Sequence, residues 1–147
     1  MITEDYVSFE TAKLLKEKGF DEDTNCYYIE GSVEKIYYSP IRQNHNKRTT
    51  NNEFDIYIDI TSGKISAPTI QMAMKWLRKK YNLHIITLPY APMDRNAYHP
   101  DFEADMVYIA QLFKGIIPKD EIGRKVIKLT HEEACDAAIK YCLEKLI

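Results

Sequence analysis

The stretch FDIYIDITSGKISAPTIQMAMKWLRKKYNLHII, residues 54–86, decides the fold class. Apolar and polar side chains alternate strictly over residues 54–60, which is typical of a strand with one buried face and one solvated face. Over residues 70–81 the apolar side chains recur at the spacing of one helix face, which predicts an amphipathic helix. The nearly continuous apolar run at residues 83–88 then predicts an interior strand.

The helix predicted over residues 70–81 also has start and stop signals. Ser66 and Thr69 are both suited to cap its N-terminus, and Pro68 is tolerated in a first helical turn. Asn82 follows the last apolar position and ends the helix. The segment therefore reads as strand, helix and strand.

Similar signals predict a helix near each end of the chain. Ser8 caps the first helix, Gly19 ends it in a left-handed conformation, and Phe20 then packs back on the helix. Thr130 and Glu133 have the spacing of a capping box, which begins the terminal helix.

The remaining strands are predicted from β-branched and aromatic side chains. Residues 26–30 and 33–38 flank a Gly-Ser pair and read as a hairpin that Pro40 ends. Residues 102–113 fit either a helix or a strand, and we favour the strand because β-branched and aromatic residues adjoin there without a helix cap upstream. Residues 124–129 predict the last strand.

The predicted order of elements is α-β-β-β-α-β-β-β-α over a single domain, residues 1–147. Most connections between strands are short, which favours antiparallel pairing. We therefore predict an α+β fold in which about three helices cover one face of a mixed, mostly antiparallel sheet.

The composition is that of a globular protein, with 29% charged and 45% hydrophobic residues among 147. A formal net charge of −2 provides no general attraction to nucleic acid or to anionic membranes. The acidic start MITEDYVSF differs from a signal peptide, and no apolar run approaches the roughly 20 residues that cross a bilayer. We expect a cytoplasmic protein without a membrane partner, in which Cys26, Cys135 and Cys142 are buried, reduced thiols.

Two cationic segments are candidates for binding nucleic acid, because rows of cations neutralise phosphates and release counterions. One is a stripe on the helix at residues 70–81, and the other is a loop within residues 42–52, which contain no aliphatic side chain and predict solvated chain. An alternative explains the stripe without a ligand, since cations near a helix C-terminus complement its dipole. The candidate residues are Arg42, Lys47, Arg48, Lys75, Arg78 and Lys79.

Two other groups of side chains are candidates for a protein interface. Four tyrosines crowd the predicted hairpin, and neighbouring strand residues point to opposite faces, so about half of them stay outside the core. The terminal helix has a broad face of small residues that suits close packing on a sheet or on another chain. The interface candidates are Tyr27, Tyr28, Tyr37, Tyr38, Ala134, Ala137 and Tyr141.

No catalytic residue is predicted. The chain has no phosphate-binding loop, dinucleotide glycine fingerprint, GxSxG elbow or HExxH motif. Only His99 and Asp101, with Asp94 nearby, offer metal ligands in one loop, and their spacing matches no known site. We expect neither a metal nor a cofactor.

The segments SFETAKLLKEKGF, SAPTIQMAMKWLRKKYNLHI and THEEACDAAIKYCLEKLI carry a resemblance that spans most of the chain. They resemble a group of small proteins encoded by phages and prophages of gut bacteria, a group with no established activity, cofactor or site residues. The resemblance implies a phage-associated, intracellular setting and no role for a particular residue.

The leading hypothesis is a non-enzymatic binding module that associates with itself or with another protein. A nucleic-acid-binding accessory protein that uses the two cationic segments is the first alternative. An enzyme of unassigned class is the second, with the loop around His99 as the edge of its pocket.

Overall fold

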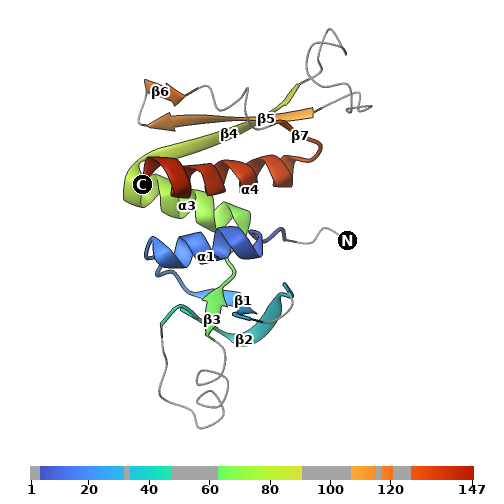
Figure 1. Ribbon diagram of the computed structural model, residues 1–147, viewed down its shortest axis with the longest axis vertical. Helices are drawn as coiled ribbons and strands as arrows, with labels where there is room; N and C mark the ends of the chain where they lie inside the picture. The colour runs from blue at the N-terminus through green and yellow to red at the C-terminus, as the bar shows by residue number, and fades with distance from the viewer. Residues whose placement is uncertain (1–3, 32–33, 48–62, 91–106, 115–116, 121–126) are drawn as a thin grey trace. The chain divides into compact units, whose positions relative to one another are not determined.

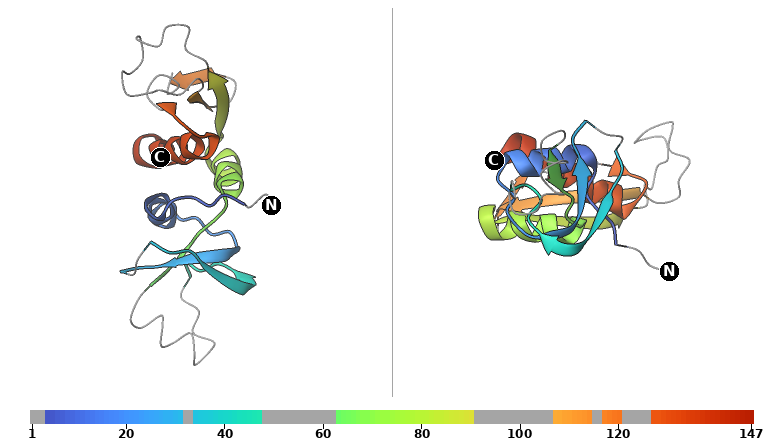
Figure 2. Two further views of the ribbon diagram at one scale, coloured as in Figure 1. Left: turned by 90° about the vertical axis from the view of Figure 1, so that its right-hand side faces the viewer. Right: turned by 90° about the horizontal axis from the view of Figure 1, so that it is seen from below.

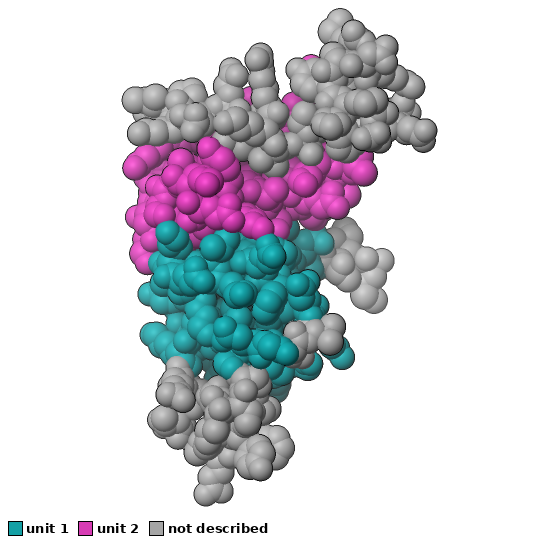
Figure 3. Space-filling model, viewed as in Figure 1, with its two compact units in different colours: residues 1–73 teal, residues 74–147 magenta. Residues whose placement is uncertain are grey.

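The computed structural model describes residues 4–31, 34–47, 63–90, 107–114, 117–120 and 127–147 (Figure 1). The chain divides into two compact units, residues 1–73 and residues 74–147 (Figure 3). Helix α3, Ile70–Tyr81, contributes residues to both units. The described residues form three α-helices and two antiparallel sheets, which confirms the predicted α+β class, while the single domain stays a prediction.

Unit 1 is a three-stranded antiparallel sheet with helix α1, Phe9–Glu17, packed on one face (Figures 1 and 2). Its strands are β1 (Thr24–Ile29), β2 (Tyr37–Gln43) and β3 (Lys64–Ser66), in the order β2-β1-β3. Alternate β1 residues are buried, and among them Tyr28 donates its hydroxyl hydrogen to the carbonyl of Val7 at 2.8 Å.

The antiparallel pairing of the predicted hairpin is confirmed by β1 and β2, but the second strand begins at Tyr37 and residues 34–36, which were predicted as strand, are not part of it. The short strand β3 was not predicted, and the strand predicted over residues 54–60 lies outside the described residues.

Both ends of α1 follow the predicted capping. The Ser8 hydroxyl accepts a hydrogen bond from the amide of Thr11 at 3.3 Å. Gly19 has φ 80°, and the amide of Phe20 donates to the carbonyl of Leu15 at 2.9 Å. Phe20 and Leu15 are both buried, so the chain turns back onto the helix as expected.

Pro40 does not end the hairpin, contrary to the prediction. Strand β2 passes through it to Gln43, and four residues of β2 lie opposite one residue of β1 between the pairs Cys26–Tyr38 and Thr24–Gln43. Proline is tolerated here because β2 is an edge strand with a bulge, where no partner requires its missing amide hydrogen.

The solvated loop predicted at residues 42–52 is wrong for its first part, where Asn44 and His45 are buried. The side-chain amides of Asn44 and Asn46 donate to the carbonyls of Asp21 and Phe20, each at 2.9 Å. The Asn46 side chain also accepts from the amide of Ser66, and His45 Nε2 lies 3.1 Å from the carbonyl of Thr24. Polar side chains thus hold this amide loop, Asn44–Asn46, in place without apolar residues.

Unit 2 is an antiparallel sheet with strand β5, Val107–Lys114, at its centre. Strand β4 (Leu83–Tyr90) pairs with one side of β5, and the short strands β6 (Ile117–Asp120) and β7 (Ile127–Lys128) pair with the other. The strand favoured over the helix near residues 107–113 is therefore confirmed. The last strand, predicted over residues 124–129, is confirmed at the two residues of β7, its residues 124–126 lie outside the described residues, and β6 was not predicted.

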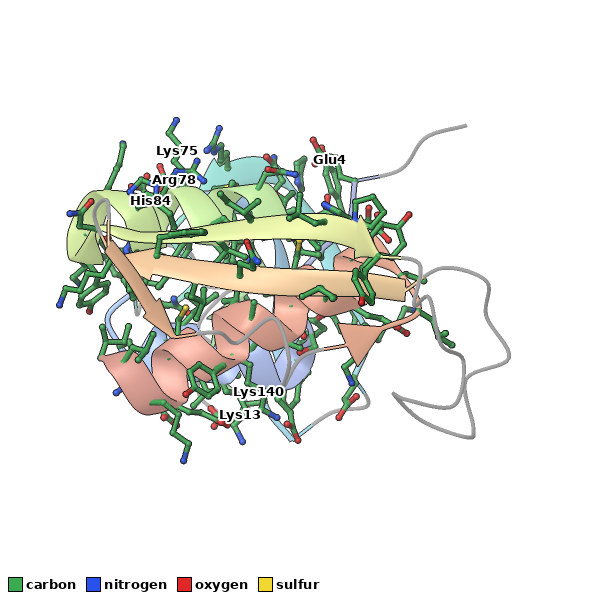
Figure 4. The ribbon with its side chains drawn as sticks, turned by 90° about the horizontal axis from the view of Figure 1, so that it is seen from above. Glu4, Lys13, Lys75, Arg78, His84 and Lys140 are labelled. Carbon is green, nitrogen blue, oxygen red and sulfur yellow. The ribbon has the colours of Figure 1, made fainter. Side chains whose placement is uncertain are left out.

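Helix α4, His131–Tyr141, covers one face of this sheet and continues as a π-helical turn, Cys142–Leu146 (Figure 4). The Thr130 hydroxyl accepts from the amide of Glu133 at 3.2 Å, as the capping signal predicts. For α3, Thr69 rather than Ser66 is the cap, since its hydroxyl accepts from the amide of Met72 at 3.2 Å. Asn82 has φ 55° and ends α3 as expected.

Among the described strands, β4 lies at the edge of its sheet, where an interior strand was predicted. Leu83 and Ile85 are buried, whereas Ile86 and Leu88 are exposed. One face of β4 therefore belongs to the core and the other does not, although both faces carry apolar side chains.

Candidate functional site

The most unusual surface in the described residues is the face of the unit 2 sheet that points away from α4, here called the outer face. On β4, Ile86 and Leu88 are 45% and 46% exposed. Their partners on β5 are Gln111, which is exposed, and Ile109, which is partly exposed. Contiguous exposed apolar side chains mark interaction sites, and Ile86, Leu88 and Ile109 are neighbours on this face.

The orientation of β4 follows from its contacts with α4. The hydroxyl of Thr87 lies 3.0 Å from the Cys135 sulfur of α4. Residues of odd number in β4 therefore face α4, because side chains alternate along a strand. Ile86 and Leu88 then point to the outer face, together with His84 and Tyr90.

Sequence reasoning missed Ile86 and Leu88 as candidates. The run LHIITL has apolar side chains on both faces, so its periodicity does not separate a buried face from a binding face. The signal that was available is Pro89, because proline in a strand indicates an edge position.

The predicted cationic stripe lies on the solvated side of α3. Lys75, Arg78 and Lys79 are exposed, and no described residue forms an ion pair with them. Figure 4 shows Lys75 and Arg78 together with His84 on the side of the sheet where β4 forms the edge. The cationic stripe, Lys75, Arg78 and Lys79, thus belongs to the helix beside the β4 edge, and Lys75 and Arg78 project past that edge when the sheet is viewed from above.

The second cationic segment does not join the stripe in one unit. Arg42 and Lys47 are exposed residues of unit 1, and Arg48 lies outside the described residues. Arg42 donates from Nε to the carbonyl of Asp23 at 3.0 Å, beside the acidic run at residues 21–23. The local field at Arg42 is therefore mixed rather than cationic.

The four hairpin tyrosines have three different environments. Tyr28 is a core residue at 5% exposure, whereas Tyr38 is 70% exposed. Tyr27 and Tyr37 stack with ring centroids 5.7 Å apart on the face opposite α1. Lys64 lies over the Tyr27 ring at 5.3 Å and Lys35 over the Tyr37 ring at 5.6 Å, so cations flank this stack.

The small-residue face of α4 is largely covered. Ala134 is fully buried, while Ala137 and Tyr141 are partly exposed. The cysteines on this helix and in its π-helical turn are buried free thiols, as is Cys26, which agrees with the prediction. Ala134 has no exposed surface to offer a partner, and Ala137 and Tyr141 offer part of theirs.

His131 and Cys135 lie one turn apart on α4, with the sulfur 3.9 Å from Nδ1 and 3.8 Å from Nε2. The near-equal distances mean that neither ring nitrogen is aimed at the thiol. Burial raises the pKa of Cys135, whereas a nucleophilic cysteine needs a lowered pKa. This pair is therefore a packing contact rather than an activated nucleophile.

Two other groups have a raised pKa. Burial raises the pKa of the Cys142 thiol to about 12. A hydrogen bond with the Cys26 thiol, followed by burial, raises the pKa of Tyr6 to about 12. Neither group lies on the outer face, and both favour their neutral forms at ordinary pH.

The described residues contain no group of three or more His, Cys, Asp or Glu side chains that would hold a metal ion. His99, Asp94 and Asp101 lie outside them. None of the helices that the structure describes combines the length and apolar character of a membrane span. The chain matches no protein-family model, no curated protein and no solved structure.

Proposed function

We propose that this protein is a non-enzymatic binding module that takes a partner protein on unit 2. The observation that carries the proposal is the exposure of Ile86 and Leu88, two adjacent outward positions of an ordered strand. Burying apolar surface stabilises a complex by about 25 cal/mol per Å², so a partner that covers these two side chains binds more tightly for doing so.

The chemistry of the outer face favours a protein over a nucleic acid. Its central residues are Ile86, Leu88 and Ile109, which suit aliphatic and aromatic side chains of a partner. Bases bind mainly by stacking on aromatic rings, and this part of the face has none at its centre. Within unit 2 the nucleic-acid alternative has the cationic stripe as its support, since Arg42 and Lys47 belong to unit 1.

The setting expected from the sequence resemblance, an intracellular protein of a phage or prophage, is part of this proposal. A binding role fits an exposed apolar face on β4 and a sequence in which no familiar catalytic motif is found. The hairpin residue Tyr38, at 70% exposure, offers unit 1 a separate contact for the same or another partner.

The proposal is tested by a peptide-display selection against the full chain, followed by affinity measurements on the selected peptides. We expect peptides rich in apolar residues whose affinity falls by about tenfold or more for Leu88→Asp, because the charge would be desolvated in the interface. Ile41→Asp is the matched control, since Ile41 is 67% exposed but belongs to unit 1. Selected peptides that bind both variants as well as the wild type would overturn the proposal.

A further inference from the structure

We infer that the free edge of β4 accepts an extended acidic segment of a partner chain as an additional strand. This inference rests on the proposed function, because it names the kind of protein segment that unit 2 would take. Three observations support it: the free edge itself, the direction of its backbone groups and the cations beside it.

The first observation is an edge without the usual protection. Strand β4 pairs with β5 residue by residue from Leu83 to Tyr90 without a bulge, and no described strand pairs with its other side. Its eight residues, LHIITLPY, include no Asp, Glu, Lys or Arg. Natural edge strands are usually blunted by charges, bulges or short length, and β4 has only Pro89 near one end.

The second observation is that Pro89 determines which backbone groups face the edge. Residues of an antiparallel pair alternate between exchanging two hydrogen bonds and exchanging none. Proline has no amide hydrogen, so unbroken pairing through Tyr90 requires that the even-numbered residues bond to β5. The amides of Ile85 and Thr87 then point to the free edge, where they are available to a partner strand.

Pro89 also limits the position of an added strand. It presents a carbonyl but no donor to the edge, so a partner strand pairs best along Leu83–Thr87. This is the half of β4 that follows directly from α3, whose last turn carries Arg78 and Lys79.

The third observation is the charge beside this half. Helix α3 turns back at Asn82, so its last turns lie near the start of β4, and Figure 4 shows Lys75 and Arg78 projecting past the β4 edge of the sheet. The cations have no ion-pair partner among the described residues. An acidic segment on the β4 edge therefore adds charge complementarity to the backbone hydrogen bonds.

The same features of the β4 edge disfavour two other occupants, a second copy of the chain and a single-stranded nucleic acid. A second copy of the chain would bring a β4 strand without Asp or Glu, so it offers the cationic stripe no opposite charge. A single-stranded nucleic acid has phosphates for the cations but does not extend the backbone ladder of Ile85 and Thr87. Only an acidic peptide uses both features.

The test measures binding of fluorescent peptides of about six residues, the usual length of a strand, to the full-length chain. The first peptide alternates Glu and Val, and the second alternates Lys and Val. The third is the Glu-Val peptide with N-methyl groups on every second backbone amide, so that one edge of the peptide strand cannot donate hydrogen bonds. A single-stranded oligothymidylate is the nucleic-acid probe. Sedimentation velocity at low and high protein concentration reports self-association.

We expect the Glu-Val peptide to bind at least about tenfold more tightly than either of the other peptides, and binding to weaken with added salt. The double variant Lys75→Glu, Arg78→Glu should reverse the preference between the Glu and Lys peptides. Lys145→Glu is the control, since Lys145 is an exposed cation on the π-helical turn. Thr87→Pro should abolish peptide binding while leaving the β4–β5 pairing intact, and the N-methyl peptide makes the same test on the unchanged protein.

Equal binding of the N-methylated and unmodified peptides would overturn the added strand, and tighter binding of oligothymidylate would overturn the acidic-peptide partner. Dimerisation that Thr87→Pro abolishes would assign the edge to a second copy and overturn the inference as well. These failures are separate from failure of the proposed function, which is read from Leu88→Asp on the outer face.

Discussion

The two edge strands β2 and β4 have opposite characters. Strand β2 is bulged at residues 39–42, contains Pro40 and Arg42, and is followed by the amide loop. Strand β4 is regular over eight residues, uncharged and apolar on its outer face. Both are paired on one side only within the described residues.

The difference shows how the same kind of element is closed in one unit and left open in the other. A bulge and a proline leave β2 no regular row of donors and acceptors for another strand. No such device interrupts β4 before Pro89. Unit 1 is therefore the sheet with the protected edge, and unit 2 is the one for which we propose a partner strand.

The sharpest test of this comparison uses two adjacent residues of β4. Ile85→Ala should lower the free energy of unfolding by about 2–4 kcal/mol, because Ile85 is a core residue at 7% exposure. Ile86→Ala should lower it by less than about 1 kcal/mol, since Ile86 is 45% exposed. Urea titrations of both variants measure the two values, and similar losses would show that both faces of β4 are covered.

The closure of unit 1 is tested at the amide loop. Asn46→Ala removes the bond to the Ser66 amide and the bond to the Phe20 carbonyl, and it leaves both backbone groups without that partner. We expect a loss of about 1–3 kcal/mol in the free energy of unfolding. Lys47→Ala, at the exposed next residue, should change it by less than about 0.5 kcal/mol. If Asn46→Ala changed the free energy of unfolding as little as Lys47→Ala, the hydrogen bonds of the amide loop would not stabilise unit 1.

The smallest expected effect is a pH dependence of stability that reports one of the two buried thiols of unit 2, Cys142. Burial raises the pKa of Cys142 to about 12 in the folded chain, from about 9.0 for an exposed thiol. The unfolded chain therefore loses this proton first, so the contribution to stability is complete below about pH 9 and declines as pH rises toward 12. The free energy of unfolding should fall with a slope that approaches about 1.4 kcal/mol per pH unit. Urea titrations over pH 9–10.5 should give a shallower slope for the Cys142→Ala variant. An unchanged slope would assign the alkaline loss to other groups such as Tyr6.

The elements that could be predicted are those whose signals are local. Ser8, Gly19, Thr130 and Asn82 set helix ends through hydrogen bonds to residues a few positions away, and the structure has these ends as expected. Strand partners depend on distant residues, so the three-residue strand β3 was missed, and β4 was expected in the sheet interior.

The candidate site could be predicted only in part. The exposure of Lys75, Arg78 and Lys79 follows from helix periodicity, which is a local pattern. The exposure of Ile86 and Leu88 does not, because an aliphatic side chain is equally suited to a core and to an interface. The prediction of a solvated loop was wrong at the amide loop because polar side chains can also be buried when they find partners. Asn44 and Asn46 donate to carbonyls more than twenty residues away in the sequence.

The position of Trp76 has a practical consequence for all of these experiments. It is the single tryptophan of the chain, 3% exposed, with its ring edge-on to Tyr81 at 5.3 Å. It lies on α3 between Lys75 and Arg78 in sequence but on the covered side of the helix. Its fluorescence emission therefore shifts to longer wavelength when α3 loses its packing, and a label-free optical signal is available from the helix that carries the cationic stripe.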